Sequence, residues 1–364
     1  MAAKASLIGV IVNVGKDVDL SVAHAFARAV RERGGEVAMS RGDGHADKPE
    51  LARCDAWVCV GGDGTIIRAS KAAAAAGVPL LGMNLGTLGY LAEVEPADAD
   101  WLAGRLMRGE YRVEERMLLH MAYAPASPVQ GEAAVPSTPA QGEAITPAAP
   151  AQGEMTNTSA SAQGEATAPA SLTQGEATAP VSLTQGEATD PPPIVGWDAS
   201  SHLSGGDSWD GRSLIALNEV VVSRGSAPHV VSLKLYVNST LIDVYAGDGI
   251  LVSTPTGSTA YAFSAGGPIV DPELELFSIV PICPHMILPK PVLVEPGKTI
   301  TIVPHRAGRG VSASVAVDGV AMPDLCHGQA LVIRRATRPV RMARFAEDSF
   351  YTVLKRKLYN RERL

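Results

Sequence analysis

The sequence lacks the signatures of the most familiar nucleotide-binding and membrane proteins. Its 364 residues contain no G-x-G-x-x-G fingerprint and no G-x-x-x-x-G-K-[ST] loop. These absences argue against a dehydrogenase-type dinucleotide site and against a P-loop nucleoside triphosphatase. No stretch approaches the roughly 20 consecutive apolar residues that a membrane-spanning helix needs.

Cysteine, aromatic residues and positive charge are also scarce. The four cysteines are Cys54, Cys59, Cys283 and Cys326. They have no zinc-type spacing and lie in or beside apolar runs, so we expect buried, reduced thiols and a cytoplasmic protein.

Residues 125–211 hold ten acidic residues and no Lys or Arg, which leaves 31 basic residues against 28 acidic ones elsewhere. This balance is too weak to indicate nucleic-acid binding, and no basic amphipathic stretch indicates a membrane surface.

The periodicity of apolar residues predicts two kinds of architecture. Residues 6–13, 36–39, 56–60 and 78–82 are expected as strands that alternate with helices, which is typical of an α/β, Rossmann-like parallel sheet with its ligand at the carboxyl ends of the strands. From residue 111 onward, short β-rich runs separated by turn signals predict a mostly β-sandwich domain. The expected domains are 1–110 for the α/β part, 111–124 with 212–340 for the sandwich, and 341–364 as a segment that packs back on the first domain.

Residues 125–211 are expected to belong to neither domain. The triplet Gln-Gly-Glu recurs there six times at a period of eleven residues, among eleven prolines. Such a composition has too little apolar bulk to offset the entropy of ordering, so we predict a disordered insert. A spacer or partner-binding arm is one hypothesis for it, and an expanded repeat tolerated in a surface loop is the other.

Residues 61–65, Gly-Gly-Asp-Gly-Thr, lie between an expected strand and an expected helix. Glycines let backbone N–H groups approach an anion, and a helix N-terminus favours negative charge, so the turn suits phosphate. The carboxylate of Asp63 repels a polyphosphate unless it accepts a proton or meets a metal on the phosphates, which indicates phosphoryl transfer. The structural alternative is a tight turn in which Asp63 only caps the helix.

A second block, at residues 248–268, concentrates hydroxyl groups beside Gly and Pro. We expect these hydroxyls to point outward and Tyr261 to stack on a base, an arrangement that suits adenine and ribose. Asn218 and Glu219, which close an expected strand, add an amide and a carboxylate that suit ribose hydroxyls. Taken alone, these two residues are also compatible with an exposed turn.

Together these motifs resemble the NAD kinase family. The resemblance rests on residues 61–65, on the run Asn-x-Gly-x-Leu-Gly-aromatic-Leu at 84–91, on Asn218 with Glu219, and on the block at 248–268. It implies an NAD kinase-like fold and phosphorylation of the 2′-hydroxyl of the adenosine ribose of NAD by ATP, with Mg²⁺ carried on the ATP phosphates rather than held by a protein metal cage. Two alternatives remain open: a diacylglycerol-type lipid kinase with the same glycine turn, and a catalytically silent NAD-binding regulator.

The resemblance also implies roles for individual residues. Asp63 would be the proton acceptor. The phosphate-binding turn would comprise Gly61, Gly62, Gly64 and Thr65. The NAD-binding residues would be Asp63, Gly64, Arg68, Asn218, Glu219, Ala246, Asp248, Thr259, Ala260, Tyr261 and Ser264. It implies a homo-oligomer, dimer or tetramer, with NAD and ATP as its small-molecule partners, and leaves open polyphosphate as donor and NADH as acceptor.

Overall fold

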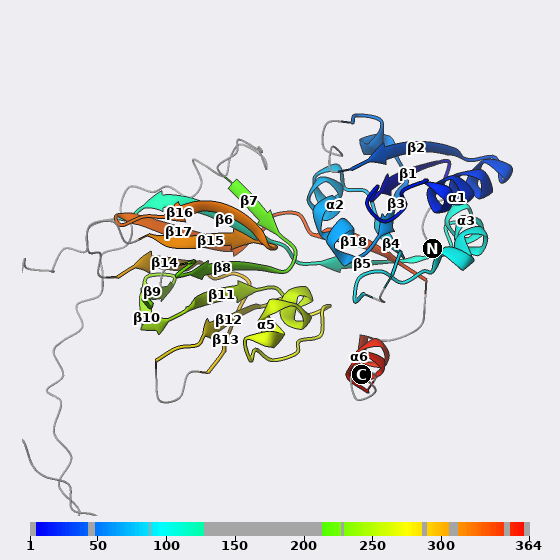
Figure 1. Cartoon of the computed structure of the whole chain (residues 1–364). Helices are drawn as coiled ribbons and strands as arrows, with labels where there is room; N and C mark the ends of the chain where they lie inside the picture. The colour runs from blue at the N-terminus through cyan, green and yellow to red at the C-terminus, as the bar shows by residue number, and fades with distance from the viewer. Residues whose placement is uncertain are drawn as a thin grey trace, which may run out of the picture. The chain divides into compact units, whose positions relative to one another are not determined.

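The computed structural model of the chain describes residues 5–42, 48–86, 89–126, 213–226, 229–285, 290–305, 312–345 and 350–359. The predicted disordered insert lies outside these residues except at Pro125 and Ala126. Within them, an N-terminal α/β domain built on a parallel sheet is joined to a C-terminal domain of two antiparallel sheets, as the sequence predicted (Figure 1).

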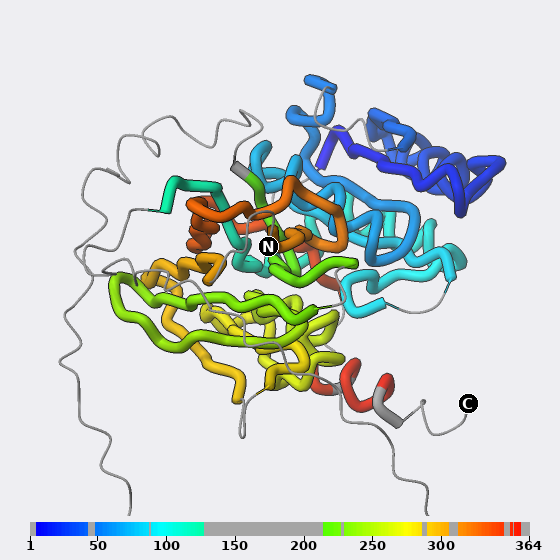
Figure 2. Tube along the Cα trace, turned by 60° about the vertical axis from the view of Figure 1, so that its left-hand side comes forward, coloured from blue at the N-terminus to red at the C-terminus, as the bar shows by residue number. Residues whose placement is uncertain are grey.

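The α/β domain contains a six-stranded sheet. In spatial order the strands are β2 (Glu36–Arg41), β1 (Leu7–Val12), β3 (Ala56–Gly61), β4 (Leu80–Asn84), β18 (Val340–Arg344) and β5 (Arg112–Arg116). Neighbours from β2 to β18 pair in parallel, whereas β5 runs antiparallel to β18. The last two strands come from outside residues 1–110, and the chain can be followed back into this sheet in Figure 2.

Helices cover both faces of this sheet. Helix α1 (Ser21–Glu32) and helix α3 (Ala99–Met107) share one apolar core with the sheet, while α2 (Asp63–Ala76) packs into another. Burial on both faces explains why β3 and β4 are apolar without alternation. Helix α2 ends at Gly77, whose φ of 69° is the left-handed conformation that glycine adopts without strain.

The C-terminal domain consists of two six-stranded antiparallel sheets. The first has the order β10 (Thr240–Gly247), β9 (Val231–Val237), β14 (Ile300–Pro304), β17 (Gln329–Arg335), β6 (Leu119–Pro125) and β7 (Ser213–Ala216). The second has the order β13 (Val292–Val294), β12 (Phe277–Ile282), β11 (Gly249–Ser253), β8 (Glu219–Ser223), β15 (Ala313–Val317) and β16 (Val320–Leu325). Alternate residues of both sheets form one core, including Leu233, Ile250, Phe277 and Ile302.

Strands β6 and β7 show how the chain resumes after residue 212. They pair antiparallel, with Ala122 opposite Ser213 and Leu119 opposite Ala216. The chain therefore leaves the sheet and enters it again on neighbouring strands.

Further short elements complete the described residues. They are the 3₁₀ turns η1 (Leu51–Arg53), η2 (Pro96–Asp98) and η3 (Thr256–Thr259), and the helices α5 (Tyr261–Ser264) and α6 (Phe350–Tyr359). Within the described segments, no helix combines the length and apolarity needed to cross a bilayer.

The expectation for the cysteines is half right. Cys54 and Cys59 are buried, and burial raises the pKa of the Cys54 thiol to about 11. Cys283 and Cys326, expected to be buried as well, are exposed. Cys283 lies just beyond the buried strand β12, and Cys326 lies just beyond β16, which is itself mostly exposed.

Candidate active site

Helix α2 begins at Asp63, which places its carboxylate at the positive end of the helix dipole. Gly62 precedes the helix in extended conformation and makes no side-chain cap. The Asp63 carboxylate instead accepts backbone N–H bonds from three consecutive residues: Tyr90 to Oδ2 at 2.7 Å, and Leu91 and Ala92 to Oδ1 at 3.2 and 3.3 Å. The carboxylate is therefore fixed between the glycine turn and residues 90–92.

Gly89 makes this arrangement possible. A Cβ on Gly89 would lie 1.8 Å from Asp63 Oδ1, so only glycine leaves room for the carboxylate. Since a carboxylate oxygen has two lone pairs, Oδ2 retains an acceptor position after its bond from Tyr90, whereas Oδ1 already accepts two bonds. Asp63 thus combines a fixed position with an acceptor site that no donor among the described residues occupies.

Residues after β1 surround the same glycine turn. Asn13 Nδ2 donates to Thr65 Oγ1 at 3.1 Å, and a Cβ on Gly61 would lie 2.4 Å from that hydroxyl oxygen. A Cβ on Gly62 would lie 2.9 Å from Lys16 Nζ, and one on Gly86 would lie 3.7 Å from it. An ammonium group therefore lies beside the backbone that suits phosphate.

The carboxyl end of β4 adds an oxygen to this edge. Asn84 is opposite Gly61 in the sheet, and its Nδ2 donates to Gly86 O at 2.7 Å. Asn84 Oδ1 is buried and finds no hydrogen-bond donor among the described residues. The described segments contain no cluster of three or more His, Cys, Asp or Glu side chains suited to a metal ion.

The turn at residues 217–219 is held by a carboxylate from the β15–β16 hairpin. Asp318 Oδ2 accepts the N–H of Leu217 at 3.0 Å, and Oδ1 accepts those of Asn218 at 2.8 Å and Glu219 at 3.3 Å. Asn218 is half-buried and Glu219 is buried. The alternative of an exposed turn is therefore wrong for Glu219, which is buried in the protein.

Glu219 has an unusual electrostatic environment. The pKa of its carboxyl is raised to about 7, first by burial and second by the nearby charge of Asp318, while the backbone N–H of Tyr261 acts to lower it. Its Oε2 is buried and has no hydrogen-bond partner within the described part of the chain. A ligand hydroxyl would satisfy this oxygen and favour the ionised form.

The hydroxyl-rich block packs against the same turn, although its hydroxyls do not point outward as predicted. Thr254 Oγ1 donates to Leu217 O at 2.6 Å, and Ser258 Oγ contacts both the N–H and the carbonyl of Val270. Ser253, Thr254, Thr256 and Ser258 are all buried. The expectation was wrong for these four. The hydroxyls of Ser253, Thr254 and Ser258 bond to backbone groups instead of facing outward. Thr256 Oγ1 is buried and has no hydrogen-bond partner among the described residues.

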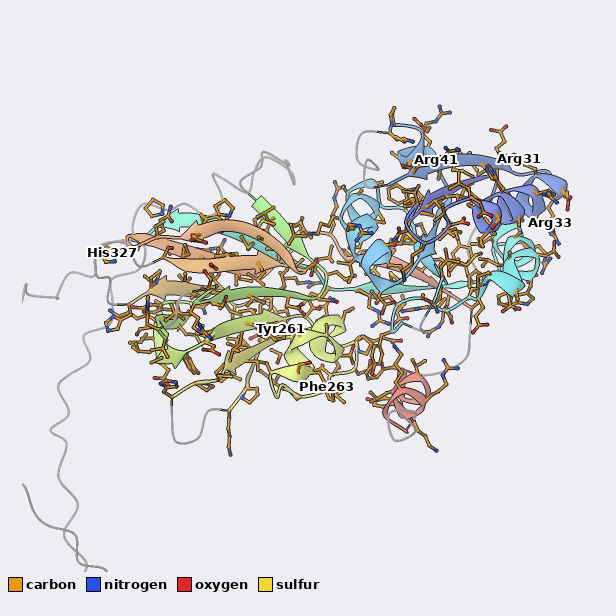
Figure 3. All side chains as sticks on the ribbon, in the orientation of Figure 1. Arg31, Arg33, Arg41, Tyr261, Phe263 and His327 are labelled. Carbon is orange, nitrogen blue, oxygen red and sulfur yellow. The ribbon has the colours of Figure 1, made fainter. Side chains whose placement is uncertain are left out.

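The residues at the end of this block are accessible. Tyr261 begins the short helix α5 with 43% of its surface exposed, and Ser264 is exposed at the other end of that helix. Figure 3 shows Tyr261 and Phe263 on α5. Thr259 and Ala260 are half-buried, whereas Gly64 and Arg68 on α2 are exposed.

Ala246 and Asp248 lie apart from the other predicted NAD-binding residues. Strands β8 and β11 pair so that Glu219 is opposite Ser253, while Ser223 is opposite Gly249. Asp248 is therefore five residues from Ser253, about 17 Å along an extended strand. It forms an ion pair there with Arg224, Nε to Oδ1 at 2.7 Å.

Two family models match the chain and together span most of the described residues. The ATP-NAD kinase N-terminal domain matches residues 3–111, and the ATP-NAD kinase C-terminal domain matches residues 217–345. The chain belongs to the NAD kinase family. The predicted family is thereby confirmed.

Relatives within the NAD kinase family align over nearly the whole chain. The NAD kinase of Ruminiclostridium cellulolyticum is 28% identical and covers 98% of both chains, and that of Acetivibrio thermocellus is 28% identical and covers 97% of both. The fold resembles an Archaeoglobus fulgidus NAD kinase solved with ATP, with a TM-score of 0.58 and 20% identity over 97% of this chain and 98% of that one. It also resembles the yeast NADH kinase solved with NADH, with a TM-score of 0.62 and 16% identity over 94% of this chain and 84% of that one.

Sequence reasoning missed four residues that shape this NAD kinase-family site: Asn13, Lys16, Gly89 and Asp318. For Asn13 and Lys16 a signal existed, because residues that follow the first strand of a parallel sheet lie at the same edge as the glycine turn. Gly89 and Asp318 were noticed only as parts of a loop and a hairpin. Their contacts join segments distant in the sequence, so no local pattern reports them.

Proposed function

We propose that this member of the NAD kinase family transfers the terminal phosphoryl group of ATP to the 2′-hydroxyl of the adenosine ribose of NAD, giving NADP. Asp63 Oδ2 takes the proton of that hydroxyl as the new O–P bond forms and the bond to ADP breaks. The observation that carries the proposal is the Asp63 carboxylate, fixed by three backbone N–H groups at the start of α2 with one acceptor site left on Oδ2. A ribose hydroxyl is a poor nucleophile at neutral pH, so a positioned base is the expected device.

The phosphates of ATP lie at the glycine turn. Gly61, Gly62, Gly64 and Thr65 present backbone near the N-terminus of α2, where an anion is favoured. Lys16 supports this placement, because its ammonium lies beside Gly62 and Gly86 and no described carboxylate forms an ion pair with it. Its charge offsets the negative charge that the Asp63 carboxylate adds to the same turn.

Magnesium enters as the ATP complex. Mg²⁺ prefers oxygen ligands and is often bound through substrate phosphates with one or two protein groups. Asn84 Oδ1, which is buried and has no donor among the described residues, is an oxygen of this kind at the phosphate edge of the sheet. When bound, the ion neutralises charge on the transferred phosphoryl group.

NAD binds along the turn at 217–219 and the block that packs on it. Asn218 and Glu219 bond ribose hydroxyls, and the exposed ring of Tyr261 stacks on adenine beside Thr259, Ala260 and Ser264. Arg68 and Gly64 contact the ligand from α2, and Ala246 with Asp248 contact the nicotinamide side. Because Asp248 precedes the end of β11 opposite Ser253, we expect the nicotinamide side of NAD at that end of the strand.

We infer a cytoplasmic homo-oligomer, a dimer or a tetramer. Strand β10 is an edge strand, and Leu241 and Ile242 on it are 43% and 42% exposed. An unpaired edge with apolar side chains favours pairing with another chain. The four free cysteines support a reducing compartment. The domain limits 1–110, 111–124 with 212–340, and 341–364 stand as part of the same proposal, except that β5 (Arg112–Arg116) pairs with β18 in the sheet of the first domain.

The test is to incubate the purified protein with Mg-ATP and either NAD or diacylglycerol and to measure NADP and phosphatidate. NADP alone is expected. Asp63→Asn should lower kcat by about 10²–10⁴-fold, the range for a lost general base, while NAD still binds. Phosphatidate without NADP, or wild-type kcat in the variant, contradicts the proposal; NAD binding without any product identifies a silent regulator.

A further inference from the structure

Asp318 is a buried carboxylate that is hydrogen-bonded to the turn at residues 217–219. Its side chain is 1% exposed, and besides accepting three backbone N–H groups it donates its own N–H to Glu219 O at 3.0 Å. Four hydrogen bonds therefore join one residue of the β15–β16 hairpin to three consecutive residues about 100 positions earlier in the chain.

The hairpin by itself does not require this carboxylate. Asp318 and Gly319 have φ values of 48° and 78°, the left-handed pair that a two-residue turn needs, and glycine or asparagine serves as well at the first position. Burying a charge is costly unless it is paired and hydrogen-bonded. The buried charge is therefore explained by the groups that Asp318 contacts outside the hairpin, and not by the hairpin turn alone.

The partner of this charge comes from the other domain. Lys71 Nζ lies 3.6 Å from Asp318 Oδ2, and Lys71 is on α2, the helix that begins at Asp63. The chain thus contains a continuous path from the helix carrying the candidate base, through Lys71 and Asp318, to the backbone of Asn218 and Glu219.

We propose that Asp318 is a positioning residue for NAD recognition, and that its ion pair with Lys71 fixes the turn at 217–219 relative to the helix that begins at Asp63. The proposal rests on the proposed function, because it assigns that turn to the acceptor substrate. It adds a coupling between the domain that carries the base and the domain that holds the hydroxyl to be phosphorylated. A displacement on the order of 1 Å between such groups is enough to lower a rate about 10²-fold.

The same pair controls the charge of Glu219. Facing its carboxylate are the carboxylate of Asp318 and the backbone N–H of Tyr261, and the ammonium of Lys71 lies behind Asp318. Burial is the main cause of the raised pKa of Glu219, about 7, and the charge of Asp318 is the second. Removing the Asp318 charge should lower this pKa, whereas removing the Lys71 charge should raise it, because Asp318 is then less compensated.

The test is whether removing the charge of Asp318 and removing that of Lys71 shift the pH dependence of NAD binding in opposite directions. NAD binding to wild type, Asp318→Asn, Lys71→Met and Lys71→Arg is measured by calorimetry from pH 5.5 to 9, with kcat and KM for both substrates at each pH. Asparagine tolerates the left-handed backbone at position 318. NAD binding should weaken as the pH falls and Glu219 becomes protonated; we call the midpoint of this loss the acid limb. We expect the acid limb to shift to lower pH in Asp318→Asn and to higher pH in Lys71→Met, each by about half a pH unit or more. In Lys71→Arg it should stay at the wild-type pH. The kcat/KM for NAD should fall about tenfold or more in the first two, with KM for ATP within about twofold.

Lys298→Met is the matched control, since it breaks an ion pair with Glu295 on the surface and should leave every reading at the wild-type value. The proposal is overturned if the acid limb stays in place in both test variants, if it moves the same way in both, or if only the melting temperature changes. Should Asp318→Asn fail to fold, the Lys71 variants decide alone, because they leave the buried carboxylate intact. If the wild-type protein binds NAD but forms no NADP, the proposed function is refuted. The pH dependence of NAD binding can still be compared among the variants, so the positioning role of Asp318 is tested separately.

Discussion

Gly89 leaves open the space in which the Asp63 carboxylate lies: a Cβ on residue 89 would stand 1.8 Å from Asp63 Oδ1 and 2.2 Å from its Cγ. The backbone of residues 89–92 therefore lies so close to the carboxylate that any residue other than glycine at position 89 would clash with it. This contact ties the start of α2 to the loop after β4.

Gly89→Ala should displace the Asp63 carboxylate and lower kcat about 10²-fold or more, because the base loses its alignment with the acceptor hydroxyl. NAD binding should change much less, since the residues of the turn at 217–219 are untouched. Gly297→Ala is the control, because its Cβ would meet nothing closer than Glu295 Oε1 at 3.5 Å. Steady-state kinetics and NAD titration decide; full activity in Gly89→Ala would show that the carboxylate needs no such confinement.

Tyr261→Ala should weaken NAD binding by about 1–3 kcal/mol, the range for stacking a base on an aromatic ring. The ring is 43% exposed, so its removal should leave the melting temperature nearly unchanged. Tyr351→Ala removes another exposed ring, 60% exposed on α6, and serves as the comparison. An NAD dissociation constant equal to that of wild type would assign Tyr261 a role other than stacking.

Glu219→Gln should stabilise the protein at pH 8 by about 3 kcal/mol relative to its effect at pH 4.5, given that one pKa unit corresponds to about 1.4 kcal/mol. The pKa of Glu219 is raised to about 7 in the fold, mainly by burial, from its ordinary value of 4.5. A raised pKa means that folding favours the neutral acid, so its contribution is complete below about pH 4.5 and is lost as pH rises through about 7. The side chain of the variant stays neutral, so the stability of the variant relative to wild type should increase as the pH rises across this interval.

Thermal melts from pH 4.5 to 8.5 measure this difference between variant and wild type. Glu295→Gln, at a side chain 68% exposed, should show no such trend. A melting-temperature difference for Glu219→Gln that is constant with pH would contradict the assignment of a titrating carboxyl at this position. NAD binding is expected to weaken in the same variant, because the amide no longer accepts ribose hydroxyls through a charged oxygen.

Deleting residues 127–212 and joining Ala126 to Ser213 with a short Gly/Ser link should keep kinase activity within a few-fold. Strands β6 and β7 are neighbours in the sheet, so a short connection spans them. Closure entropy changes by only about 0.6 kcal/mol per doubling of loop length and favours the shorter loop. Kinetics and a thermal melt test this; loss of activity with an unshifted, cooperative melt would assign the Gln-Gly-Glu repeats a role in catalysis or assembly.

Local sequence patterns identified much of this molecule. The alternation of apolar strands and helices predicted the parallel sheet, and the glycine turn at residues 61–65 was expected between a strand and a helix, which are β3 and α2. These features are encoded within a few residues of one another, because strand period, turn conformation and helix initiation are local properties. The family could be recognised for the same reason.

The tertiary structure alone decided how these pieces act on each other. Strand β18 enters the first sheet from the end of the chain, Tyr90 donates its N–H to Asp63, and Asp318 holds the turn that precedes β8. It also turned the hydroxyls of residues 253–258 inward and raised the pKa of Glu219 by burial. Each of these outcomes depends on which distant segments become neighbours, and burial, hydrogen-bond partners and the field at a carboxylate exist only once the chain has brought them together.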